Sequence, residues 1–195
     1  MEQPLSRSRP ERTAWVVVWS SFALFCLLVV FVPLGARHFV LHATVARPAT
    51  LQTVEGTAVS DNPATGNEAA VTRDQTATIS EGFVISLDDK SRADLRFFDG
   101  SFVHLLPGSR VALERSSGPR FGSGISPNAI WLRMLSGRIR VVTAGSSRHT
   151  GLDFRVRCPL QDAEILISDD GVYGVEVQTS GAEVFVNRGS AVVSA

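Results

Sequence analysis

Net charge and cysteine are both scarce in this sequence of 195 residues. Its 19 basic side chains are balanced by 19 acidic ones, so it lacks the basic surface that nucleic-acid-binding proteins need. Its two cysteines, Cys26 and Cys158, are too few for a disulfide scaffold, and no Cys/His cluster predicts a zinc site. Cys26 lies in a long hydrophobic run, so the two thiols are expected to sit in different compartments. No disulfide between Cys26 and Cys158 is therefore expected. Cys158 is interpreted as a small core residue, the alternative being an intermolecular disulfide or a reactive thiol.

Histidine is also scarce, and the four residues are His38, His42, His104 and His149. His38 and His42 would share a face if a helix ran through them, but no third ligand is nearby, so we expect a polar stalk rather than a metal site. His104 lies near Asp99 and Ser101 in the sequence. A catalytic triad needs specific geometry and an oxyanion hole, so Asp99 and Ser101 are better explained as turn residues.

Paired carboxylates occur at Asp88-Asp89 and at Asp169-Asp170. Neither pair has the alternating oxygen spacing of a calcium-binding loop, so both are interpreted as solvated turns. We therefore expect no catalytic residue, no metal and no cofactor, and a protein that is not an enzyme.

One long hydrophobic run is present, from Ala14 to Val32. As a helix, 19 such residues would rise about 28 Å, enough to cross the hydrocarbon core of a bilayer. Trp15 and Trp19 lie near its N-terminal end, where indole rings favour the headgroup layer. Residues 14–34 are therefore predicted to form a transmembrane helix that ends at Pro33 and Gly35. A cleaved signal peptide is the alternative, although its apolar region would be shorter.

Basic residues on either side of this run predict its orientation. Arg7, Arg9 and Arg12 precede it, while Arg37 and the more distant Arg47 follow it. This bias favours an N-terminus inside the cell. The predicted order is a short cytoplasmic tail at 1–13, the transmembrane helix, a linker at 35–50 and an all-β domain at 51–195 outside the cytoplasm.

The region after the run alternates between short apolar segments and turn residues. In Phe154-Arg155-Val156-Arg157-Cys158 every second side chain is apolar, which is typical of a strand with one buried face. Asp99-Gly100 lies between two apolar runs and predicts a hairpin, and Ser136-Gly137 and Ser180-Gly181 are interpreted as similar turns. No helix is expected here. Candidate strands lie at 51–59, 69–72, 83–87, 93–98, 102–106, 110–114, 130–135, 138–143, 152–158, 164–167, 172–178, 183–186 and 191–193.

The longest irregular stretch, from Arg115 to Asn128, is rich in Ser, Gly and Pro. A loop of this length in a compact β domain is either mobile or functional. Both interpretations remain open from the sequence.

From Ile85 to Leu113 the sequence combines an apolar strand, Asp-Gly-Ser, a second strand, a Pro/Ser turn and a third strand. A strand–Gly–strand element follows at 132–139, a strand ending before Pro159, and a closing strand–Gly–strand element at 181–193. In this order the elements resemble the FecR-type sensor domain, over about residues 54–194. The residues that match its turn pattern are Asp99, Gly100, Ser101, Pro107, Ser109, Gly137 and Gly189.

The resemblance implies a solenoid-like stack of short antiparallel or meandering strands, with these turns as corners. Members of the family are often transmembrane regulators. Their outer domain receives a signal from an outer-membrane receptor, and their cytoplasmic domain controls an extracytoplasmic-function sigma factor. Here only a short basic tail precedes the anchor and the sequence ends at Ala195, so direct control of a sigma factor is not expected.

The expected function is that of a sensing or protein-interaction module in envelope signalling, linked to such a sigma factor through a partner. The alternative is a structural or scaffolding envelope protein that binds wall polymer without signalling. Expected partners are membrane lipid, contacted by the helix, and a protein of the envelope or membrane, but no nucleic acid. The expected location is the cytoplasmic membrane, crossed once, with the β domain periplasmic or extracellular. An uncovered final strand is a candidate binding edge.

Overall fold

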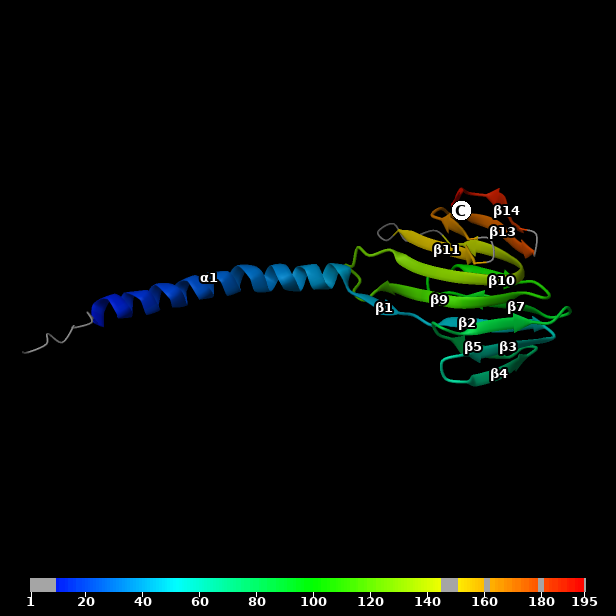
Figure 1. Ribbon diagram of the computed structural model, residues 1–195, viewed down its shortest axis with the longest axis horizontal. Helices are drawn as coiled ribbons and strands as arrows, with labels where there is room; N and C mark the ends of the chain where they lie inside the picture. Colours follow the sequence, from blue (N-terminus) through cyan, green and yellow to red (C-terminus); the bar gives the residue numbers. More distant parts are fainter. Residues whose placement is uncertain (1–9, 145–150, 160–161, 179–180, 195) are drawn as a thin grey trace, which may run out of the picture.

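The protein consists of one N-terminal helix and a β domain (Figure 1). The computed structural model describes residues 10–144, 151–159, 162–178 and 181–194. Most of the expected tail, His149 and Ser180 lie outside these residues. The elements are α1 (Pro10–His42), β1 (Thr44–Ala46), β2 (Ala49–Glu55), β3 (Thr57–Asn62), β4 (Asn67–Thr72), β5 (Thr76–Ile79), β6 (Val84–Leu87), β7 (Arg92–Arg96), β8 (Phe102–Leu105), β9 (Arg110–Pro119), β10 (Asn128–Thr143), β11 (Leu152–Cys158), β12 (Ala163–Ile167), β13 (Gly171–Gln178), β14 (Gly181–Arg188) and β15 (Ala191–Ser194).

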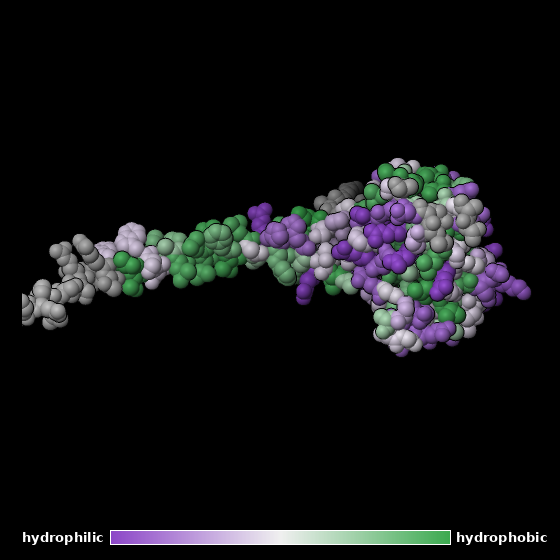
Figure 2. All heavy atoms as spheres, viewed as in Figure 1, coloured by the Kyte–Doolittle hydropathy of each residue, from purple (hydrophilic) through white to green (hydrophobic). Residues whose placement is uncertain are grey.

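α1 is long and apolar enough to cross a membrane. The segment from Ala14 to His42 includes a window with mean hydropathy 2.5, none of it buried within the protein. Figure 2 shows apolar side chains over most of its length, whereas the visible face of the β domain is mixed. The prediction that Pro33 and Gly35 end the helix is wrong, because α1 continues through both to His42. The first half of the expected linker is therefore helical.

The end of α1 is held by the segment between β9 and β10, residues 120–127, which we name the junction loop. The amide of Ile125 donates to the carbonyl of Leu41 at 2.9 Å, and that of Arg120 donates to the carbonyl of Ala43 at 2.8 Å. The last carbonyls of a helix have no partner within it, so these bonds stabilise the last turn. β9 extends to Pro119, so the irregular stretch is shorter than predicted and contacts the helix.

The sheet bends through β10, the longest strand. Its N-terminal half, up to Ser136, pairs with β9 and β11. Its C-terminal half, from Gly137, pairs with β8 and β13. Gly137 has φ +89° and lies beside an irregularity in the pairing with β9. The sequence predicted a turn between two strands at Ser136-Gly137. The structure instead has a bend within one strand there.

The strands form two walls that enclose one core. One wall contains β4, β3, β6, β9, the first half of β10, β11, β12 and β15. The other contains β5, β2, β7, β8, the second half of β10, β13 and β14. Among the described strands only β10 and β11 pair in parallel. The all-β fold with one preceding helix is confirmed, but the sheet is a nearly closed, barrel-like arrangement rather than a clear solenoid.

The chain crosses between the walls at both ends of the barrel. β10 starts beside the junction loop and runs away from it to Gly137. Gly108 and Asp88 lie at that far end, where the Gly108 amide donates to the Asp88 carbonyl at 2.9 Å. The turn after β7 and the corner before β15 lie at the end nearer the helix. The expected corner glycines therefore occur at opposite ends of the domain.

Alternating apolar residues fill the space between the walls. Phe154, Val156 and Cys158 of β11 are fully buried, as their period predicts, and Arg155 and Arg157 lie on the outer face. The largest buried side chains come from both walls, and include Tyr173, Phe154, Leu51, Ile79, Ile85, Leu95, Leu105, Leu113, Ile130, Leu132, Met134 and Ile139. Strand β5, which the sequence did not indicate, places Ile79 in this core.

Candidate functional site: a tryptophan and arginine surface

Six of the seven residues of the turn pattern form two separate groups. After β7, the Asp99 carboxylate accepts hydrogen bonds from the Ser101 amide at 2.9 Å and from its hydroxyl at 2.8 Å. Gly100 supplies the positive φ, +90°, that this turn requires. The Ser101 hydroxyl also accepts a bond from the Ala144 amide at 3.1 Å. These residues tie the turn to the end of β10.

The second group lies at the far end of the barrel. The Ser109 hydroxyl donates to the Arg138 carbonyl at 2.6 Å and accepts from the Arg138 amide at 3.1 Å. Pro107 is half-buried in the same corner. A methyl group on Gly137 would lie 2.5 Å from the Ser109 Cα. Gly189, with φ +100°, is at the other end of the barrel, against Tyr173.

His104 does not meet Ser101 and Asp99. Ser101 is buried, while His104 lies on the outer face and its ring nitrogen is 2.6 Å from the Asp94 carboxylate across β7 and β8. His38 and His42 do stack, with ring centroids 4.3 Å apart, because α1 continues through them. Within the part of the chain that the structure describes, no group of three or more His, Cys, Asp or Glu side chains could hold a metal ion.

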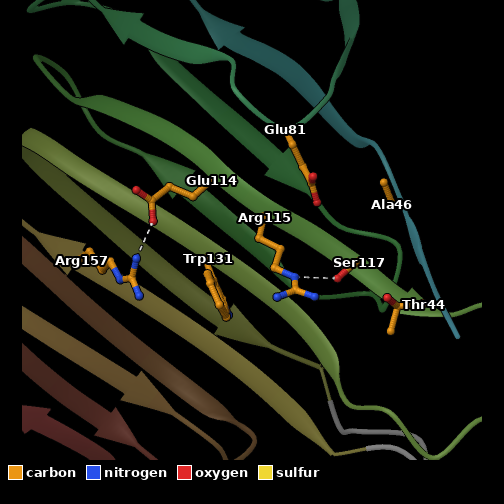
Figure 3. Close-up of a pocket in the computed structure, with 8 residues that line it drawn as sticks. All are labelled: Thr44, Ala46, Glu81, Glu114, Arg115, Ser117, Trp131 and Arg157. Carbon is orange, nitrogen blue, oxygen red and sulfur yellow. Dashed lines mark hydrogen bonds and ion pairs between the residues drawn. The ribbon is translucent and has the colours of Figure 1, made fainter. Parts of the chain in front are cut away.

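A cluster that the sequence did not indicate lies on the outer face of β9, β10 and β11, centred on Trp131 (Figure 3). Arg115 and Arg155 are its cross-strand neighbours on either side, each with its guanidinium carbon 4.9 Å from the ring centroid. The Arg157 guanidinium is 5.2 Å away. Such cation–π contacts contribute about 0.5–1 kcal/mol each at exposed sites. The indole nitrogen donates to Asp153 at 3.2 Å.

Carboxylates hold Arg133, Arg155 and Arg157 in place, whereas Arg115 donates to the Ser117 hydroxyl. Glu114 is the extra residue of a β-bulge opposite β10, so both Glu114 and Arg115 lie on the outer face. Glu114 forms ion pairs with Arg133 and with Arg157, the latter at 3.4 Å. Glu164 pairs with Arg157 and Arg155, both at 3.3 Å.

The closest partner of Arg155 is Asp153, which lies two residues earlier in the same strand. Its guanidinium is 2.7 Å from the Asp153 carboxylate, and this hydrogen bond is the main reason that the pKa of Arg155 is raised. An arginine is charged at physiological pH in any case, so the bond to Asp153 serves to position the guanidinium against the Trp131 ring.

Trp131 borders a hollow of about 480 Å³ next to the helix end of the domain. Figure 3 shows Thr44 and Ala46 of β1 on one side and the Trp131 cluster on the other. The remaining lining residues are Glu81, Glu114, Arg115, Ser117 and Arg157. We call the outer face formed by Glu114, Arg115, Trp131, Arg133, Asp153, Arg155, Arg157 and Glu164, with this hollow, the Trp131 surface.

Comparison with known protein families gives one match, to the family described as FecR protein, over residues 83–192. The chain belongs to the FecR family. No curated protein matches, and no solved structure matches. The suspected family membership is therefore confirmed. The FecR match begins before β6 and extends into β15, so it contains every residue of the turn pattern and all of the Trp131 surface except Thr44, Ala46 and Glu81 of the hollow.

The expected open end of the FecR domain is formed by β14 and β15. Each pairs with one strand among the described residues, β14 with β13 and β15 with β12. Phe185 and Val186 of β14 and Val192 and Val193 of β15 are exposed. Outward-facing arginines were visible in the sequence at 155 and 157, but nothing local in the sequence indicated that Trp131 would lie between them and Arg115.

Proposed function

We propose that this FecR protein is a membrane-anchored sensing or protein-interaction module in envelope signalling, working by binding rather than by catalysis. Family membership supports a signalling role. The helix Ala14–His42 supports attachment to a membrane. Ser101, just before β8, is buried, whereas His104 of β8 lies on the outer face, and this separation supports binding over acyl-transfer chemistry.

The observation that carries this proposal is the composition of the Trp131 surface. Tryptophan and arginine dominate the energetically important residues of protein–protein interfaces. The surface has four arginines and, counting Glu81 of the hollow, four carboxylates, so its formal charge is balanced. A partner with mixed charges suits such a surface, whereas nucleic acid requires a basic one.

The proposed location is the cytoplasmic membrane, with α1 as an uncleaved single-pass anchor. Arg7, Arg9 and Arg12 precede the apolar run, which favours an inside N-terminus and so supports a β domain in the periplasm or outside the cell. The proposed link to an extracytoplasmic-function sigma factor runs through a membrane partner.

Crosslinked pull-down of the full-length protein from its own membrane tests the proposal. Wild type is compared with Trp131→Ala, with Arg115→Ala as a milder change of the same surface. Arg140→Ala is the matched control, because Arg140 is exposed in β10 but belongs to the half that pairs with β8 and β13. We expect a regulator of a sigma factor, recovered with wild type and the control and lost with the other two variants.

Two results would overturn the proposal. Recovery of wall polymer alone would favour the structural, non-signalling function. Equal recovery of a regulator with all four proteins would show that the Trp131 surface is not where the partner binds. Because Arg115→Ala removes a half-buried guanidinium from the outer face without opening the core, it separates loss of binding from loss of folding.

A further inference from the structure

Apolar side chains remain exposed where α1 meets the β domain. Phe39 is 58% exposed, Phe121 is 36% exposed and Ile125 is 57% exposed. The rings of Phe39 and Phe121 meet edge to face, with centroids 6.4 Å apart. The helix and the junction loop thus present one continuous apolar surface, although they are about 80 residues apart in the sequence.

The position of the junction loop relative to the helix is fixed by hydrogen bonds. Its amides donate to the carbonyls of Leu41 and Ala43, and the Ser126 hydroxyl donates to the carbonyl of His42 at 3.2 Å. The strand after the helix continues this attachment, because β1 pairs with β9 and places Ala46 opposite Ser117. The loop therefore lies beside the last helical turn and cannot swing away from it without breaking these bonds.

The helix length sets the depth of this loop in a membrane. If residues 14–34 occupy the hydrocarbon core, they span about 31 Å at 1.5 Å per residue. Phe39 is five residues further, about 7.5 Å beyond the core. Each headgroup layer is about 5–7 Å thick. Phe39, and Phe121 against it, then lie at the outer part of the headgroup layer rather than in bulk water.

The two segments that meet at the junction carry charge of one sign, although Glu81 reaches the Ser116 amide from outside them. Arg37, Arg47 and Arg120 are exposed there. No Asp or Glu occurs in 33–54 or in 116–128, the segments that meet at the junction. Basic side chains beside a membrane surface are attracted to anionic lipid, by about 1 kcal/mol each. Aromatic and aliphatic residues flanked by arginine are the pattern of segments that lie in the headgroup layer.

We propose that the junction loop is a second membrane contact. Phe121 and Ile125 enter the headgroup layer of the bilayer that α1 crosses, and Arg37 and Arg120 bind the phosphates of anionic lipids. The domain is thereby held against the membrane surface in one orientation rather than on a flexible stalk. This inference rests on the membrane anchor of the proposed function.

Depth measurements by electron paramagnetic resonance test the inference. The full-length protein carries Cys26→Ala, which leaves only the buried Cys158, and is reconstituted in vesicles of phosphatidylcholine with about one-third phosphatidylglycerol. A spin label is placed in turn at Ile125→Cys, at Leu28→Cys within the anchor, and at Lys90→Cys. Lys90 is exposed in the corner between β6 and β7, at the far end of the barrel. Relative collision rates with oxygen and with a water-soluble nickel complex report depth.

We expect the label at position 125 to fall between the other two, with oxygen favoured severalfold more than at position 90. Arg120→Gln should reduce that preference in anionic vesicles and have little effect in phosphatidylcholine alone. If position 28 is protected but position 125 matches position 90, the second contact is refuted and the anchor stands. If position 28 is also as accessible to nickel as position 90, the anchor itself is refuted, and with it this inference.

Discussion

Substitution of Gly137 tests whether the bend in β10 requires glycine. Its φ is +89°, a region that costs other residues about 1–2 kcal/mol. In addition, a methyl group would lie 2.5 Å from the Ser109 Cα and 2.8 Å from the Gly108 carbonyl oxygen. Both are backbone atoms that cannot move independently of the corner, so overpacking adds about 1–3 kcal/mol.

Gly82 provides a matched control for this effect. It has the same φ, +89°, but a methyl group there would meet nothing within 4 Å. Gly82→Ala therefore measures the backbone strain, partly offset by about 0.4–1 kcal/mol from the stiffer unfolded chain. We expect Gly137→Ala to lower the free energy of unfolding by about 2–4 kcal/mol. Gly82→Ala should lower it less, and the difference between the two variants should be about 1–3 kcal/mol.

For a domain of this size, that difference corresponds to about 2–12 °C in Tm. The assay is thermal unfolding of the full-length protein in mild detergent, followed by near-ultraviolet circular dichroism, which reports the packing of aromatic rings in the β domain. Equal melting temperatures for Gly137→Ala and Gly82→Ala would refute the reasoning. The approach of β10 to the corner before β9 would then be looser than described.

Three further outcomes follow from single residues. Burial raises the pKa of the Cys158 thiol above that of a free cysteine, so the unfolded thiol ionises first. The free energy of unfolding should then fall above about pH 9, by at most about 1.4 kcal/mol per pH unit. Denaturant titrations of Cys158→Ala should show a shallower fall. Asp99→Ala removes the acceptor of two turn hydrogen bonds and should cost about 1–2 kcal/mol by the same titrations; Asp99→Asn should cost less. A methyl group on Gly124 would lie 2.7 Å from the Pro119 Cβ, so Gly124→Ala should speed hydrogen exchange of the junction-loop amides, and the unhindered Gly122→Ala should not.

Local patterns in the sequence predict the core well. Alternation in Phe154, Val156 and Cys158 depends only on the pleat of a single strand, and all three are fully buried. The Asp99-Gly100 hairpin depends on two adjacent residues and forms as predicted between β7 and β8. Family resemblance carried the same information, because its matching residues are mostly turns and alternating strands.

Features that depend on distant contacts could not be predicted in this way. Arg115, Trp131 and Arg155 meet because of a bulge in β9 and a parallel pairing of β10 with β11, and neither register is encoded locally. Pro33 and Gly35 normally end a helix. Here the helix continues, and its last carbonyls are bonded by a loop about 80 residues away.

Strand β9 connects the two surfaces for which roles are proposed. It carries Arg115 under the Trp131 ring, pairs with β1 through Ser117, and leads directly into the junction loop at Arg120. Five residues of extended chain span about 17 Å. With the loop in the headgroup layer, the Trp131 surface lies within about 17 Å of lipid, closer than the diameter of a small domain. A segment of a membrane protein just outside the bilayer fits that space better than a freely diffusing globular protein, so the partner sought by crosslinking should itself be membrane-embedded.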